Sequence, residues 1–184
     1  RTSANGGQGG AGTANTTGSY NTFIGTESGL TNQTGGSNTG VGYWSIYANT
    51  GSANTGVGQS AGFRNGTGGY NTSIGFAALT GNAGNDHSYN TAVGANSNKL
   101  VTTGGYNVTV GYGAGDNITS GDGNVIIGNV DAASATDDVQ LKISGYDGTT
   151  TANWISGEST GNVEINEVWN PSLSTTGKAF VMGF

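Results

Sequence analysis

An asparagine recurs along most of the chain at intervals of 17, 16, 17, 19, 17 and 17 residues. Each copy is followed three residues later by valine or isoleucine and four residues later by glycine. The asparagines are Asn21, Asn38, Asn54, Asn71, Asn90, Asn107 and Asn124. The β-branched residues are Ile24, Val41, Val57, Ile74, Val93, Val110 and Ile127. A disordered chain has no reason to keep these positions in phase, so the pattern predicts a repeat architecture.

The length of the repeat points to one fold class. Seventeen residues are too few for two helices and two turns, but they suit one coil of a parallel β-solenoid. Coils of this kind stack at about 4.8 Å, so that equivalent residues form ladders. We therefore predict an all-β chain with a parallel β-solenoid, or β-roll, of about seven 17-residue coils over residues 18–128. Residues 1–17 form a Gly-rich lead-in or a degenerate coil.

Side-chain alternation divides each strand between two faces. Thr55 and Val57 share one face, whereas Asn54 and Gly56 share the other, and the same holds in the other coils. We expect the Val, Ile and Thr face to point inward, because these are the apolar groups that a coil can bury. Glycines are expected at corners, where they supply positive φ or close backbone approach.

A core this thin favours association of several chains. One coil buries little more than one β-branched residue and one Ser or Ala, whereas ordering its backbone costs on the order of 1–2 kcal/mol per residue. Tyrosines just before the asparagines also need burial. They are Tyr20, Tyr70, Tyr89 and Tyr106. We predict a parallel homotrimer.

The repeat stops after Gly128, and a second region covers residues 129–184. Alternating segments at 139–143, 162–165 and 179–182 indicate antiparallel strands, joined by turns at 145–148 and 157–161. We predict that this region is a small β tip or cap that closes the open edge of the solenoid.

Composition excludes several function classes. Five Lys and Arg and a net charge of −6 argue against nucleic acid. No apolar run approaches 18 residues, so no membrane insertion is expected. The chain has no cysteine and one histidine, which leaves little room for acid–base chemistry, and we expect no enzyme activity and no cofactor. The acidic residues Asp116, Asp122 and Asp131 lack the spacing of known calcium loops, so we expect no metal site.

The units NTFIGTES, NTGVGQSA, NTSIGFAA, NTAVGANS and NVTVGYGA resemble the head repeats of trimeric autotransporter adhesins. They are also similar to repeats of bacteriophage tail-fibre proteins, which often carry a tyrosine before Asn-Thr, as in GGYNTSIG here. The resemblance covers about residues 18–128 and implies three β-rolls packed side by side. The ending NPSLSTTGKAFVMGF resembles the last residues of many phage tail and fibre proteins.

Aromatic residues are the best candidates for recognition, because their rings stack on sugars. Tyr43 and Trp44 lie in the second coil, and Tyr146, Trp154 and Trp169 lie in the C-terminal region. For both groups, packing between copies of the chain is the competing interpretation.

Three functions remain open at this point. The first is a fibrous, receptor-binding module, most simply the distal part of a phage tail fibre in the virion, which recognises a host surface glycan or another outer-surface receptor. The second is a bacterial surface adhesin or an extracellular filament subunit. The third is an ice-binding solenoid, which needs outward Thr rows; the expected inward position of the threonines argues against it.

Overall fold

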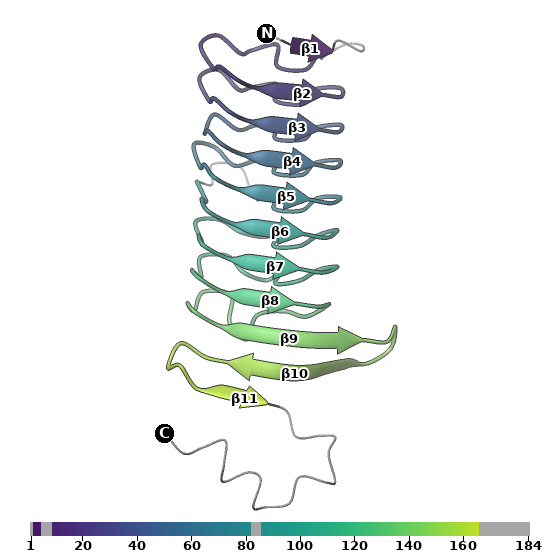
Figure 1. Ribbon diagram of the computed structural model, residues 1–184, viewed down its shortest axis with the longest axis vertical. Helices are drawn as coiled ribbons and strands as arrows, with labels where there is room; N and C mark the ends of the chain where they lie inside the picture. Colours follow the sequence, from purple (N-terminus) through teal and green to yellow (C-terminus); the bar gives the residue numbers. More distant parts are fainter. Residues whose placement is uncertain (1, 5–8, 82–85, 166–184) are drawn as a thin grey trace, which may run out of the picture.

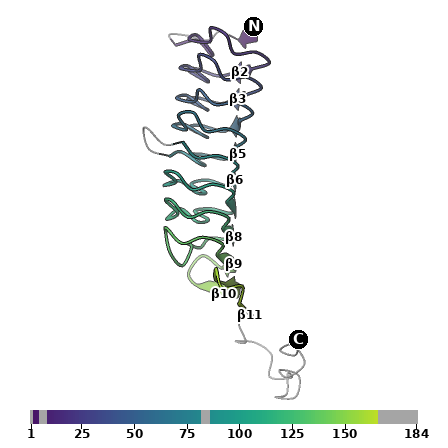
Figure 2. The ribbon, with the colours of Figure 1, turned by 90° about the vertical axis from the view of Figure 1, so that its left-hand side faces the viewer.

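The computed structural model describes residues 2–4, 9–81 and 86–165. In this part of the chain the protein is all-β and consists of stacked coils (Figure 1). Every coil adds one short strand to a single 11-stranded sheet whose strand order follows the sequence. The strands line one side of the stack and the returning loops lie on the other (Figure 2).

The first eight strands are three residues each. They are β1 (Thr2–Ala4), β2 (Thr22–Ile24), β3 (Thr39–Val41), β4 (Thr55–Val57), β5 (Thr72–Ile74), β6 (Thr91–Val93), β7 (Val108–Val110) and β8 (Val125–Ile127). All pair in parallel, with Thr opposite Thr and Val or Ile opposite Val or Ile through most of the sheet. The predicted parallel β-solenoid of about seven stacked coils is confirmed.

The sheet continues beyond the last asparagine repeat. Strand β9 (Leu141–Tyr146) pairs in parallel with β8, and β10 (Thr151–Gly157) and β11 (Val163–Ile165) then follow antiparallel. The strands expected at 139–143 and 162–165 overlap β9 and β11, although β9 begins at Leu141 and runs to Tyr146, which moves the first turn to 147–150, and β10 was not expected. The expected strand at 179–182 lies outside the described residues, and a separate tip domain stays a prediction.

The expected inward face of the strands is wrong. Ile24, Val57 and Ile74 are 49%, 38% and 40% exposed. By contrast, the middle residue of every strand from β2 to β8 is buried. The repeat asparagines are buried as well, at Asn38, Asn54, Asn71, Asn90, Asn107 and Asn124. The residues were grouped correctly, but the Asn side faces the interior and the Thr and Val or Ile side faces outward.

A ladder of hydrogen bonds explains this orientation. Asn107 Oδ1 accepts from the backbone N–H of Asn124 at 2.9 Å, and Asn107 Nδ2 donates to the carbonyl of Gly121 at 2.9 Å. The backbone bond recurs from Asn21 to Asn124, and Gln140 adds the last rung by donating its N–H to Asn124 Oδ1 at 2.8 Å. Each asparagine therefore ties its coil to the next one from inside the stack.

The remaining interior is filled by matching large residues with glycines. Ile46 lies between Gly40 and Gly56, where an added Cβ would come within 2.8 Å and 2.7 Å of its side chain. Phe23 packs in the same way against Gly12 and Gly29. Ser or Ala lies on the opposite wall and is fully buried, as expected, at Ser28, Ser45, Ala61, Ala78, Ser97 and Ala114.

Glycine is required at the corner after each strand. Gly58 has φ +128°, and a Cβ there would lie 2.6 Å from the carbonyl oxygen of Gly75 in the next coil. A side chain would therefore push the coils apart as well as strain the backbone. The expected role of these corner glycines is confirmed.

Replacement of one ladder asparagine tests the source of stability. We expect Asn107→Ala to lower the free energy of unfolding by roughly 2–5 kcal/mol, because it leaves the N–H of Asn124 and the carbonyl of Gly121 unpaired inside the stack. The exposed Asn162→Ala is the control and should cost less than about 0.5 kcal/mol. Denaturant unfolding followed by circular dichroism measures both, and equal losses would contradict the ladder's role.

Candidate functional site

The outward side of the sheet forms a long uncharged surface, which we call the flat face. It consists of the first and third residues of β2 to β8. Five successive coils present Thr beside Val or Ile, and the last two present Val108 with Val110 and Val125 with Ile127. Neighbouring rows repeat at about 4.8 Å along the stack, and the two columns lie about 6.7 Å apart. The face therefore combines methyl groups and hydroxyls in a regular array.

A second surface is the aromatic cluster of Tyr43, Trp44, Tyr47 and Phe63. The Trp44 ring stacks on Tyr43 at 4.5 Å and on Phe63 at 5.3 Å between ring centroids. Trp44 Nε1 donates to Glu27 Oε2 at 2.6 Å, which joins this cluster to the coil before it. Trp44 also makes an edge contact with Tyr47, so three rings and one carboxylate surround it and little of its ring face is left for a ligand.

The tyrosines before the asparagines form a column on the surface. Tyr70, Tyr89 and Tyr106 stack with centroids 5.1 Å and 4.8 Å apart and with nearly parallel planes. All three have φ of 58° to 60°, a left-handed conformation that costs a non-glycine residue energy. Tyr20 has the same conformation and is 91% exposed. The residues are exposed in one chain, as expected of groups that another molecule could cover.

The C-terminal aromatic candidates are not brought together by a described contact. Trp154 in β10 is exposed and its ring lies over Gly145 in β9, and Tyr146 is exposed at the end of β9. Trp169 lies outside the described residues. The predicted sugar-binding role of these residues stays a prediction.

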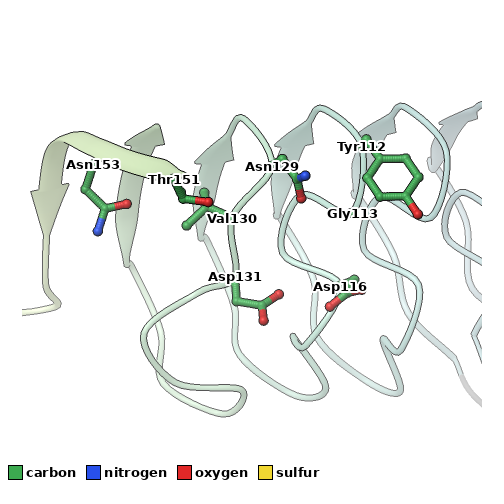
Figure 3. A pocket seen from close by; sticks show the side chains of 8 residues that line it. All are labelled: Tyr112, Gly113, Asp116, Asn129, Val130, Asp131, Thr151 and Asn153. Carbon is green, nitrogen blue, oxygen red and sulfur yellow. The ribbon is translucent and has the colours of Figure 1, made fainter. Parts of the chain in front are cut away.

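A pocket lies where the last coils meet β10, and we call it the junction pocket (Figure 3). Its volume is about 400 Å³, and it is lined by Tyr112, Gly113, Asp116, Asn129, Val130, Asp131, Thr151 and Asn153. Tyr112 and Asn129 occupy the same position in successive coils, two residues after β7 and β8. Asp116 and Asp131 come from the loops that follow.

The two carboxyl groups of the junction pocket interact directly. Burial raises the pKa of Asp116, and a hydrogen bond and the charge of Asp131 raise it further, whereas Lys99 lowers it. Because like charges so close repel each other, the pair favours a ligand that supplies hydrogen-bond donors. Among the described residues, no three His, Asp or Glu lie close enough to hold a metal ion.

His87 is the one buried titratable group away from this pocket in the described chain. It takes the place of a repeat glycine, and its carbonyl accepts from Asn71 Nδ2 at 2.9 Å. Neither ring nitrogen has a hydrogen-bond partner among the described residues. Burial lowers the pKa of His87 to about 4, against a smaller opposing effect of Asp86. The ring is therefore neutral at pH 7, and the residue fills space in the lengthened coil.

Sequence reasoning missed the junction pocket and the outward flat face. The pocket joins residues up to 41 positions apart, and only the register between coils and β10 brings them together. The available signal was the column two residues after each strand, in which Tyr43, Phe76 and Tyr112 recur.

Comparison with known proteins finds no matching family model, no matching curated sequence and no matching solved structure. The described part of the chain also contains no helix long and apolar enough to cross a membrane. The case for function therefore comes from the surfaces themselves.

The burial of His87 predicts a loss of stability in acid. Below pH 6.5 the unfolded chain takes up a proton that the folded chain refuses until about pH 4, so the free energy of unfolding falls across this window by up to roughly 3 kcal/mol. In His87→Leu this part of the fall should disappear. Denaturant unfolding of both proteins between pH 7 and pH 4 measures the difference, and parallel curves would contradict a buried, neutral His87.

Proposed function

We propose that this chain is a fibrous structural and receptor-binding module, most simply the distal part of a phage tail fibre that recognises a host surface glycan. The observation that carries the proposal is the row of exposed apolar side chains that follows the whole flat face of a narrow, rigid rod. The repeat's resemblance to tail-fibre and adhesin heads supports the same conclusion. A bacterial surface adhesin or extracellular filament subunit is the alternative, with the same rod displayed on a cell in place of a virion.

The flat face favours assembly into a homotrimer. Contiguous exposed apolar residues on a soluble surface mark an interaction site. Here they include Ile24, Val57, Ile74, Val110 and Ile127, each 37% to 49% exposed. The described interior holds only small apolar clusters, such as Ala78, Leu79, Ala92 and Val101. Packing three rods along these faces buries apolar groups that one chain leaves in water.

Ice binding is a second candidate, and it is favoured by the outward direction of the threonines. Thr22, Thr39, Thr55, Thr72 and Thr91 lie in one row on the flat face, so the expectation that argued against ice is overturned. The row ends where Val108 and Val125 replace threonine. An apolar partner would thus match the full length of the face, whereas ice would match only its first five coils.

The assembly state separates these two candidates. We expect multi-angle light scattering to give three times the chain mass of 18.2 kDa. Val57→Asp with Ile74→Asp should produce monomers, because a buried unpaired charge opposes packing of the flat faces. Gln59→Asp adds the same charge to an exposed residue beyond the strand and should stay trimeric.

A wild-type monomer would contradict the trimer, and a monomer that also shows thermal hysteresis in ice would favour the second candidate. A trimer that survives the double substitution would place the interface on another surface.

Attachment is tested on cells. Labelled protein should bind at least one member of a panel of bacteria, and periodate treatment of those cells should reduce binding, because periodate cleaves vicinal diols of surface sugars. Mock-treated cells are the control. Binding to no cell would contradict a receptor-binding module, and binding unchanged by periodate would contradict a glycan receptor.

A further inference from the structure

We propose that the junction pocket binds one neutral pyranose unit of a surface glycan, an inference that rests on the proposed function and gives it a location. The pocket is lined by an exposed aromatic ring, an apolar side chain and several polar groups, and only the two carboxyl groups are seen to point toward each other (Figure 3). Small-molecule sites combine these features: an apolar wall for area and a few fixed polar groups for orientation.

Tyr112 supplies the aromatic wall. It is 63% exposed, and in the described part of the chain no other aromatic ring stacks on it. Trp44 lies four coils earlier, one residue after the position equivalent to Tyr112. Two other rings stack on Trp44. The face of a pyranose ring carries C–H groups that pack on such a ring, and Val130 adds a separate apolar group to the lining, beside Thr151 (Figure 3).

Carboxylates and amides supply the polar side of the pocket. Asp116 and Asp131 point toward each other from adjacent coils, and Asn129, Thr151 and Asn153 line the remaining walls (Figure 3). An ionised carboxylate only accepts hydrogen bonds. The lining is therefore rich in acceptors and suits a ligand with several hydroxyl donors.

The charge of the lining selects among sugars. No lining residue is basic, and two are acidic. A sialic or uronic acid would bring its own negative charge against the Asp pair, which like-charge repulsion disfavours. A neutral pyranose can donate hydroxyl hydrogens to both carboxylates without this penalty.

The loop that carries Asp131 is held in place before any ligand arrives. Two hydrogen bonds join the Asn117 side chain to the backbone of Ala132. Asn117 Nδ2 donates to the Ala132 carbonyl, and the Ala132 N–H donates to Asn117 Oδ1, both at 3.0 Å. Lys142 Nζ donates to the Asp131 carbonyl at 2.9 Å. A fixed loop reduces the entropy lost on binding.

Gly113 keeps the pocket open. The equivalent position carries Glu27, Trp44, Ser60, Ala77 and Asn96 in other coils, all with positive φ. At Gly113 an added Cβ would lie 3.6 Å from Asn129 Oδ1 and 3.8 Å from Asp116 Oδ2, between the polar groups of the pocket. The column therefore tolerates side chains in other coils, including Val130, which lines the same pocket, and it lacks one only at Gly113.

This column provides a matched pair of variants. Gly113→Asn should fill the pocket without breaking the stack, because Asn96 adopts the same backbone conformation. Ser60→Asn adds the same side chain at the same position three coils away. Tyr112→Ala removes the aromatic wall, and Phe76→Ala removes the exposed ring at the same position two coils earlier.

The experiment screens the wild-type protein on a glycan array with and without EDTA and then titrates the methyl glycoside of the strongest neutral hit by NMR. Gly113→Asn and Tyr112→Ala should weaken binding by about tenfold or more, and the two controls should change it less than about twofold. Light scattering and thermal melting check that all variants keep the wild-type assembly and fold.

Several results would overturn the site. They are equal binding by Gly113→Asn and wild type, binding that EDTA abolishes, preference for acidic glycans, and no glycan bound at all. If the array is negative but periodate-sensitive binding to cells persists, only the pocket assignment fails. If cells are not bound either, the proposed function fails with it.

Discussion

The structure depends on an asparagine that reaches from one coil to the next. Its Oδ1 accepts from the backbone N–H of the asparagine in the next coil. Its Nδ2 donates to the carbonyl of the residue three positions before that asparagine, as at Asn90 and Asn107. A coil this narrow has room for few apolar side chains. The hydrogen bonds of the amide ladder therefore supply part of the stability that a hydrophobic core supplies in wider folds. Because the amides face inward, alternation sends the β-branched residues outward. The exposed apolar face is thus a consequence of the ladder.

Sequence reasoning identified the ladder residues and their stacking, because a parallel in-register sheet repeats the same residue at the same place. It assigned the wrong side to them because it weighed apolar character alone: Val57 and Ile74 were assumed to seek the interior. The contrary signal was present in Gly40 and Gly56, which stand between a Thr and a Val. A glycine at that point makes sense only if another side chain, here Ile46, needs the space. The alternation at 139–143 and 162–165 indicated β9 and β11, whereas β10 and the parallel pairing of β8 with β9 were not predicted.

The candidate site was harder to predict for a physical reason. A pocket on the side of a solenoid is made by neighbours along the axis, and neighbours along the axis are a full coil apart in sequence. Tyr112, Asp131 and Thr151 converge because a coil of about 17 residues brings its successor alongside and β10 then folds back beside them. Aromatic residues that are close in sequence, such as Tyr43 and Trp44, drew attention first, and the structure shows them stacked on one another. Proximity in sequence favours mutual packing over an open ring face.

In a repeat protein, a departure from the repeat is informative only where the column would tolerate the usual residue. His87 departs from glycine, yet it is buried and engaged through its backbone, so its departure accommodates a longer coil. Gly113 departs in the opposite direction, because a column that accepts Trp, Glu and Asn elsewhere has no packing need for glycine there. Tyr70, Tyr89 and Tyr106 show the opposite. Glycine would adopt their positive φ with less strain, yet these positions carry aromatic rings. The tyrosines lie on the surface, where a partner can contact them, and Gly113 lines the junction pocket, whereas the ladder inside leaves little freedom for any other residue.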